Sequence, residues 1–115
     1  MAQNNFDVTS YFVRIGDAMS ATFNGTTIQA RGILVCQGAD NQRIVVYFLS
    51  GSSPVPSATI TQNGKWGVLF LPHDLMGVWI DLVRNEKPLV GVINTSSPQS
   101  TYVTTSVEPV GEGET

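Results

Sequence analysis

The sequence predicts an all-β protein, a single antiparallel β-sandwich of eight or nine short strands. Three observations carry this prediction. The 115 residues include 14 Val, 7 Ile and 11 Thr, β-branched residues that fit a pleated sheet. Apolar and polar residues alternate with a period of two along most of the chain. Asn24-Gly25 and Asn63-Gly64 each separate two such stretches, and Asn-Gly pairs favour hairpin turns. A jelly roll and a small barrel remain as alternatives.

The chain has the length of one domain, and such a chain can bury a core without disulfides or metal. We expect a single β-sandwich domain over residues 1–107. Residues 1–6 lack core periodicity, which predicts an N-terminal arm. Residues 108–115 are expected to form an acidic C-terminal tail, because three of their residues are Glu and none is basic.

The first half of the chain predicts a strand at Asp7–Ile15 and then a hairpin around Asn24-Gly25. The strand that leaves this turn, Thr26–Cys36, is long. Gly32 within it indicates a bulge or a close backbone approach. The nearly continuous apolar run Arg43–Leu49 is typical of a central strand covered on both faces.

The second half begins with a loop, Ser50–Ser57, whose two prolines keep it out of a sheet interior. The segment 72–77 has room for one helical turn at most. No amphipathic helix of useful length is expected anywhere in the chain. The predicted strands are Ala58–Gln62, Lys65–Leu71, Val78–Arg84, Leu89–Asn94 and Thr101–Val107.

Core positions follow from the same alternation. Residues that share one face of a strand and are apolar are expected to point inward. The predicted structural core residues are Trp66, Val68, Phe70, Ile80 and Leu34.

The segment Thr59–Pro72 reads Thr-Ile-Thr-Gln-Asn-Gly-Lys-Trp-Gly-Val-Leu-Phe-Leu-Pro. It resembles a stretch common in immunoglobulin-like domains of bacterial surface proteins and phage structural proteins. The resemblance covers residues 26–94 at most. It implies an immunoglobulin-like sandwich in which Trp66 follows a hairpin turn and fills the core between two sheets.

The charged residues argue against several classes of protein. Six bases against nine acids, without basic clusters, are not the pattern of a nucleic-acid-binding surface. One cysteine excludes an internal disulfide, and one histidine with one cysteine excludes a structural zinc site. We expect no cofactor, no metal and no nucleic-acid partner.

No membrane span and no export signal are recognisable, so we expect synthesis and folding in the cytoplasm.

Residues 1–107 contain six acids and six bases and are therefore formally neutral. Charge normally resists self-association of a freely diffusing protein. A neutral sheet protein rich in uncharged polar residues is easier to understand if partners cover its faces.

His73-Asp74 is the one place where acid–base chemistry could be assembled around an imidazole. The pair is also typical of a turn after a strand, in which the Asp caps a short helical turn. No nucleophile motif accompanies it, and no pair of acids is placed as glycoside hydrolysis requires. We predict that the protein has no catalytic residues and is not an enzyme.

Contacts with partners are expected from exposed aromatic residues, from the proline-containing loop and from the two ends of the chain. Trp79 and Tyr47, together with Tyr11 and Tyr102, would form a platform for sugar rings if all were exposed. The candidate contact residues are Trp79, Tyr47, Pro54, Pro56, Phe6 and Glu108.

These features favour a non-enzymatic structural protein: a small phage virion component that decorates or cements the capsid, or a minor tail protein. It would be made in the host cytoplasm and located in the virion; the alternative location is cytoplasmic. The expected partners are other copies or capsid subunits, bound in part by terminal arms that pair with sheet edges. The alternative function is a carbohydrate- or protein-binding β-sandwich module.

Overall fold

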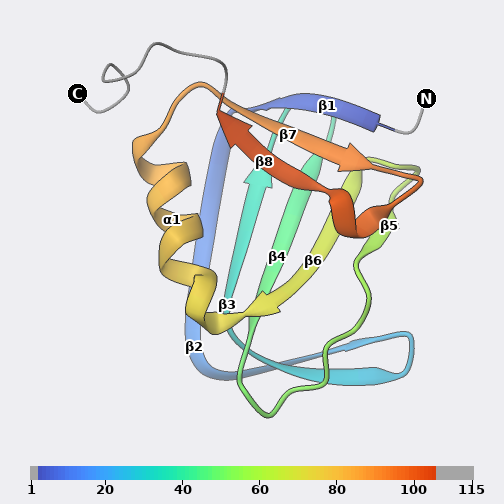
Figure 1. The fold of residues 1–115 in the computed structure, drawn as a ribbon, viewed down its shortest axis with the longest axis vertical. Coiled ribbons are helices and arrows are strands. Elements are labelled where there is room, and N and C mark those ends of the chain that lie inside the picture. The colour runs from blue at the N-terminus through green and yellow to red at the C-terminus, as the bar shows by residue number, and fades with distance from the viewer. Residues whose placement is uncertain (1–2, 106–115) are drawn as a thin grey trace.

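The computed structural model describes residues 3–105, which form two sheets and a single α-helix (Figure 1). One sheet has the strand order β1–β7–β8 and the other has β2–β3–β4–β6–β5. The all-β class is therefore confirmed, and so are two sheets. The strands are β1 Gln3–Val8, β2 Ser10–Phe23, β3 Thr26–Gln37, β4 Arg43–Leu49, β5 Thr59–Thr61, β6 Trp66–Pro72, β7 Leu89–Asn94 and β8 Tyr102–Thr105. The helices are the 3₁₀ turns η1 His73–Leu75 and η2 Pro98–Ser100, and α1 Met76–Asn85.

The chain changes sheets at Thr9, between β1 and β2. The single strand expected at Asp7–Ile15 is therefore two strands in different sheets. Residues 3–6, expected to form an arm, instead form most of β1 and pair with β7. Phe6 anchors them, because its side chain is 6% exposed.

β2 and β3 form a long hairpin whose turn is Asn24-Gly25, with φ of 49° and 82°. This is the left-handed backbone that an Asn-Gly hairpin turn requires. The pairing of β2 with β3 shifts between Ile15 and Met19, and that of β3 with β4 shifts next to Gly32. Such irregularities bend strands. The end of the hairpin accordingly turns across the lower end of the sheet in Figure 1.

The prediction of a purely antiparallel fold is wrong for one central pair. β4 and β6 run parallel, from Arg43 opposite Trp66 to Leu49 opposite Pro72. The sheet edge beyond β6 is occupied by β5, which pairs with β6 in antiparallel fashion. After β4 the chain crosses to that edge, where it forms β5, and then turns back to form β6 between β5 and β4. β6 therefore runs in the same direction as β4.

The prediction of a strand at Val78–Arg84 is also wrong, because this segment lies in α1. The expectation that the chain has no amphipathic helix of useful length is wrong for the same reason. Met76, Trp79 and Val83 recur at helical spacing and pack on the core. The apolar residues between them also alternate, which gave the strand pattern. The helix ends before Pro88, in keeping with the preference of residues preceding proline for extended backbone.

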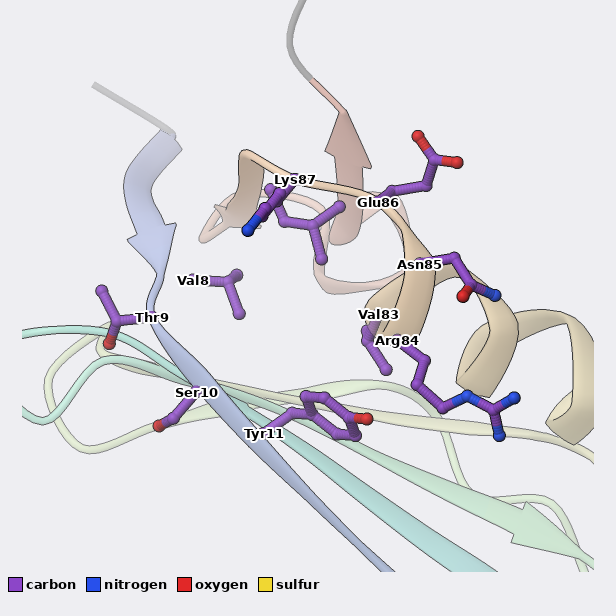
Figure 2. Close-up of a pocket in the computed structure, with 10 residues that line it drawn as sticks. Val8, Thr9, Ser10, Tyr11, Val83, Arg84, Asn85, Glu86 and Lys87 are labelled. Carbon is purple, nitrogen blue, oxygen red and sulfur yellow. The ribbon is translucent and has the colours of Figure 1, made fainter. Parts of the chain in front are cut away.

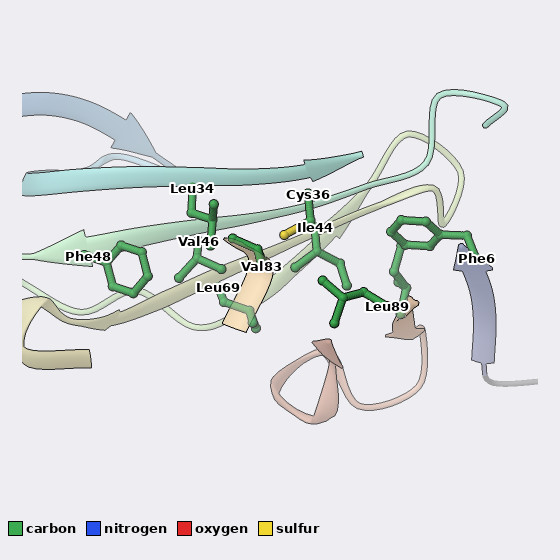
Figure 3. Packing of buried hydrophobic residues seen from close by; sticks show 10 residues of the cluster. Phe6, Leu34, Cys36, Ile44, Val46, Phe48, Leu69, Val83 and Leu89 are labelled. Atoms are coloured by element: carbon green, nitrogen blue, oxygen red, sulfur yellow. The ribbon is translucent and has the colours of Figure 1, made fainter. Parts of the chain in front are cut away.

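The main core, called here the inner cluster, lies between the two sheets and takes in α1 (Figure 3). Apolar side chains from one face of β3, β4 and β6 meet those of β1, β7 and α1. The three-stranded sheet and α1 therefore cover one face of the five-stranded sheet. The inner cluster contains Phe6, Leu34, Cys36, Ile44, Val46, Phe48, Leu69, Val83, Leu89 and Ile93.

The opposite face of the five-stranded sheet carries a second group, called the outer cluster. The Phe23 ring, next to the hairpin turn, meets the Tyr47 and Phe70 rings edge-on at centroid distances of 5.1 and 5.0 Å. The folded-over hairpin thus covers part of this face. The outer cluster contains Ile28, Ala30, Val35, Val45, Leu49, Val68 and Phe70.

Two predicted core residues lie elsewhere. Trp66 is half-buried, because it stands opposite Arg43 at the end of the β4–β6 pair. Its indole N–H donates to the Asn41 backbone oxygen at 3.0 Å, and the Arg43 guanidinium lies 4.9 Å from its ring centroid. Ile80 is half-buried on α1 and belongs to neither cluster. Leu34 is in the inner cluster.

Candidate functional site

The most distinctive surface feature is the open edge of β2. β2 is the terminal strand of the five-stranded sheet, so no strand within residues 3–105 pairs with its outer side. From Ser10 to Ile15 it pairs regularly with β3. This stretch exposes three large apolar side chains, Tyr11 (36%), Phe12 (37%) and Ile15 (69%), which we call the β2 edge patch.

The β2 edge patch is apolar on both faces of the sheet. Tyr11 is opposite Cys36 of the inner cluster, whereas Phe12 is opposite Val35 of the outer cluster. The Arg14 guanidinium lies 5.4 Å from the Phe12 ring centroid, within the range of a cation–π contact. The patch therefore consists of an extended backbone with apolar side chains above and below it.

A pocket lies directly beside this edge (Figure 2). We call it the α1–β2 pocket; its volume is about 470 Å³. Residues at the β1–β2 junction form one wall, and the last turn of α1 with the segment that follows forms the other. Tyr11 belongs to both the pocket and the β2 edge patch. The lining residues are Val8, Thr9, Ser10, Tyr11, Val83, Arg84, Asn85, Glu86, Lys87 and Leu89.

The polar lining of the α1–β2 pocket is mixed but contains two cations. Arg84 and Lys87 are both exposed, and neither has an ion pair with another residue of the range 3–105. Glu86 is the one acid in the lining. The arrangement suits a ligand that combines a carboxylate with apolar groups, because Val8, Val83 and Leu89 supply an apolar surface.

His73 and Asp74 lie beside the Ser50–Ser57 loop in a separate hollow of about 270 Å³. His73 Nδ1 is 3.4 Å from Asp74 Oδ1. No serine hydroxyl in the described part of the chain hydrogen-bonds to His73, although the hollow contains Ser50 and Ser53. The Ser53 hydroxyl instead accepts from the Gln29 N–H and donates to the Pro54 carbonyl.

The four aromatic residues proposed as a sugar platform do not lie together. Tyr47 stacks on Phe70 at the outer face, with ring centroids 5.6 Å apart. Burial raises the pKa of Tyr47, and the charge of Arg14 opposes that rise. Trp79 packs on Phe48 of the inner cluster, on the opposite face of the sheet. Tyr102 is exposed on β8, in the other sheet.

The remaining candidate contact residues are dispersed. Pro54 is exposed and Pro56 is half-buried in the loop before β5. Phe6 is buried and unavailable to a partner as the chain is folded. Glu108 lies outside the described residues.

Sequence reasoning considered Tyr11 but missed Phe12, Ile15, Arg84 and Lys87. A signal for the first two was present, because the stretch 7–15 carries apolar residues on both faces. A strand with that pattern is either central or exposes one apolar face at an edge. No comparable signal marks the two cations, because the pocket depends on α1 being a helix.

Residues 3–105 contain no group of three or more His, Cys, Asp or Glu side chains placed to hold a metal ion. No helix in that range is long and apolar enough to span a membrane. In comparisons with known proteins, no family profile, no curated protein and no solved structure matches the chain.

Proposed function

We propose that this protein is a non-enzymatic structural protein that works by binding other protein subunits through the open edge of β2. The occupant of that edge is an extended segment of a second subunit, which adds a strand to the sheet. The observation that carries the proposal is the β2 edge patch, because it combines exposed Tyr11, Phe12 and Ile15 with strand backbone that no other strand of residues 3–105 pairs with.

The chemistry of the edge supports a docking role. Proteins usually protect edge strands with charges, prolines, bulges or short strand length. From Ser10 to Ile15, β2 has no proline and only one charged residue, Arg14. The first register shift comes after Ile15. Six residues of regular edge are therefore open to pairing.

The free energy available from burying the β2 edge patch indicates how tightly one such edge can bind. Complete burial of an Ile- or Phe-sized side chain contributes about 1.5–3 kcal/mol, and the β2 edge patch residues are already partly buried. A micromolar complex requires a net binding free energy of about 8 kcal/mol, which remains after the costs of association have been subtracted. One strand edge is therefore weak by itself. A protein that bridges a joint between two subunits makes two contacts at once and gains effective concentration.

At a finer level we propose a small phage virion component that decorates or cements the capsid, or a minor tail protein. Its partners are capsid subunits or further copies of the chain. The formal neutrality of residues 3–105, with six acids and six bases, supports a surface that is covered rather than free. The resemblance of Thr59–Pro72 to immunoglobulin-like domains does not carry this proposal, because β4 and β6 are parallel and Trp66 is outside both clusters.

The test is sedimentation of the full chain with particles from its source, combined with native mass spectrometry of the chain alone. We expect retention on intact particles and an increase in the temperature at which they disassemble, because binding to the assembled state stabilises it. A chain that stays monomeric alone and remains in the supernatant with every particle tested would overturn the proposal.

A further inference from the structure

We propose that Asn24 is a site of spontaneous deamidation, at which the side chain is converted through a cyclic succinimide into aspartate and isoaspartate, and that Asn63 is protected from the same reaction. Both asparagines precede a glycine, which is the sequence in which this reaction is easiest. The two dipeptides differ in what surrounds the glycine backbone. The inference does not depend on the proposed function.

The reaction needs only the chain and water. The backbone nitrogen of the glycine loses its proton to hydroxide and attacks Cγ of the preceding asparagine. The Cγ–Nδ2 bond then breaks, and Nδ2 leaves as ammonia. Water opens the resulting ring at either carbonyl carbon. Opening at Cγ gives aspartate, whereas opening at the backbone carbonyl gives isoaspartate, whose main chain runs through Cβ and Cγ. Glycine favours ring closure because it has no Cβ beside the attacking nitrogen.

The attacking nitrogen is free at Gly25. Asn24 and Gly25 are both exposed and form the turn at the tip of the β2–β3 hairpin, at lower right in Figure 1. Among residues 3–105, the Gly25 N–H has no hydrogen-bond partner. A Cβ placed on Gly25 would have no neighbour within 4 Å. The Gly25 nitrogen can therefore turn towards Cγ of Asn24 without the loss of a hydrogen bond or of packing around it.

The corresponding nitrogen at Gly64 is engaged. The Gly64 N–H donates to the Thr61 carbonyl oxygen at 3.2 Å, and the Gly64 carbonyl oxygen accepts from the Asn4 side-chain amide at 3.0 Å. A Cβ on Gly64 would lie 2.9 Å from Asn4 Nδ2 and 3.4 Å from Thr95 Cγ2, so this backbone is also enclosed. Ring closure at Asn63 therefore requires the loss of contacts that Asn24 does not have.

The product alters the hairpin that contains it. Isoaspartate adds one main-chain atom to the turn and leaves a carboxylate at its tip. The turn joins Phe23 to Thr26, which are paired, and a two-residue turn of this kind matches the twist of its strands. A longer turn disturbs that match beside Phe23, whose ring packs on Tyr47 and Phe70. We therefore expect deamidation to loosen the part of the hairpin that covers the outer cluster.

The test is incubation of the full chain at mildly alkaline pH, followed by peptide mapping with mass spectrometry that resolves asparagine, aspartate and isoaspartate. In the folded chain, conversion at Asn24 should be about tenfold faster than at Asn63, because only Asn63 must first lose the hydrogen bonds of Gly64. In denaturant the two rates should become similar. Both rates should rise with pH, because the attacking nitrogen must be deprotonated.

Asn4→Ala is the specific variant. It removes the hydrogen bond to the Gly64 carbonyl oxygen, so conversion at Asn63 should become faster while conversion at Asn24 stays unchanged. Asn24→Gly is the control for the consequence, because Gly-Gly also suits this turn but has no side-chain amide to lose. After incubation, amide hydrogen exchange in β2 and β3 near the turn should be faster in the wild type and unchanged in Asn24→Gly.

Equal conversion of Asn24 and Asn63 in the folded chain, or faster conversion of Asn63, would overturn the inference. An unchanged rate at Asn63 in a folded Asn4→Ala chain would contradict the protection proposed for Gly64. The comparison of folded with denatured wild-type chain needs no variant, so it decides the matter even if Asn4→Ala does not fold.

Discussion

Phe6 fits into the inner cluster because the residue opposite it on β7, Gly91, has no side chain. A Cβ at position 91 would lie 2.5 Å from two atoms of the Phe6 ring and 3.1 Å from Ile44 Cδ1. A buried phenyl ring between sheets cannot move away easily. We therefore expect Gly91→Ala to lower the free energy of unfolding by about 1–3 kcal/mol, measured by urea denaturation.

Gly51→Ala is the matched control, because a Cβ there has no neighbour within 4 Å. It should leave stability unchanged or raise it by less than about 1 kcal/mol. Equal stabilities of the Gly91→Ala and Gly51→Ala chains would contradict the packing of Phe6 against β7.

Cys36 shows the effect of burial on a titratable group. Its side chain is completely buried, and desolvation raises the pKa of the thiol from 9.0 to about 12. The unfolded thiol ionises at lower pH than the folded one, so the stabilisation is complete below about pH 9 and is lost as pH rises towards 12.

Two measurements check this. The native chain should not react with a thiol reagent at about pH 8, and should react with one equivalent in denaturant. The stability margin of the wild type over Cys36→Ala should fall by about 1.4 kcal/mol between pH 8 and pH 10, because the unfolded thiol ionises across this interval and the folded thiol does not. Rapid labelling of the native chain, or a margin that grows with pH, would contradict the burial of Cys36.

At the scale of elements, α1 is one of the segments that the sequence analysis assigned wrongly. The segment shows a strand pattern, with Val78, Ile80 and Leu82 on one side and Trp79, Asp81 and Val83 on the other. It also contains few strong helix formers. Tertiary packing determines that the segment is a helix, because Met76, Trp79 and Val83 all contact the inner cluster only when the segment is helical. Local pattern cannot supply that information.

Val78→Ala distinguishes the two structures by the sign of its effect. Val78 is 69% exposed on α1, so little burial is lost. In a helix the change should raise the free energy of unfolding by about 0.5 kcal/mol, because Ala has the higher helix propensity. If the segment were a strand, Val78→Ala would lower the free energy of unfolding by up to about 1 kcal/mol. Thermal and urea denaturation of the two chains give the sign.

Other elements could be predicted because their cause is local. The β2–β3 hairpin follows from Asn24-Gly25, and β4 follows from a continuous apolar run. Gly32 marked an irregularity, and the register shift is next to it. In each case neighbouring residues contain the necessary information.

At the scale of the whole molecule, the features that sequence did not predict are those that depend on distant pairing. The parallel β4–β6 pair and the change of sheets at Thr9 depend on where β5 and β7 are placed. The α1–β2 pocket follows from the change of sheets and from the helical state of α1, since it lies between the junction at Thr9 and the end of α1. For the candidate site, sequence therefore predicted strand character and neutrality, and did not predict the pocket.

The central claim is that the β2 edge binds a partner, and Ile15→Lys tests it most directly. A lysine on an edge strand opposes strand addition. Val55→Lys is the matched control, because Val55 is 70% exposed in a loop and Ile15 is 69% exposed on β2. The measurement is retention of each chain on intact particles from the source, with thermal denaturation to show that both remain folded. We predict that Ile15→Lys abolishes retention and Val55→Lys preserves it; equal retention of the two variants would contradict the account.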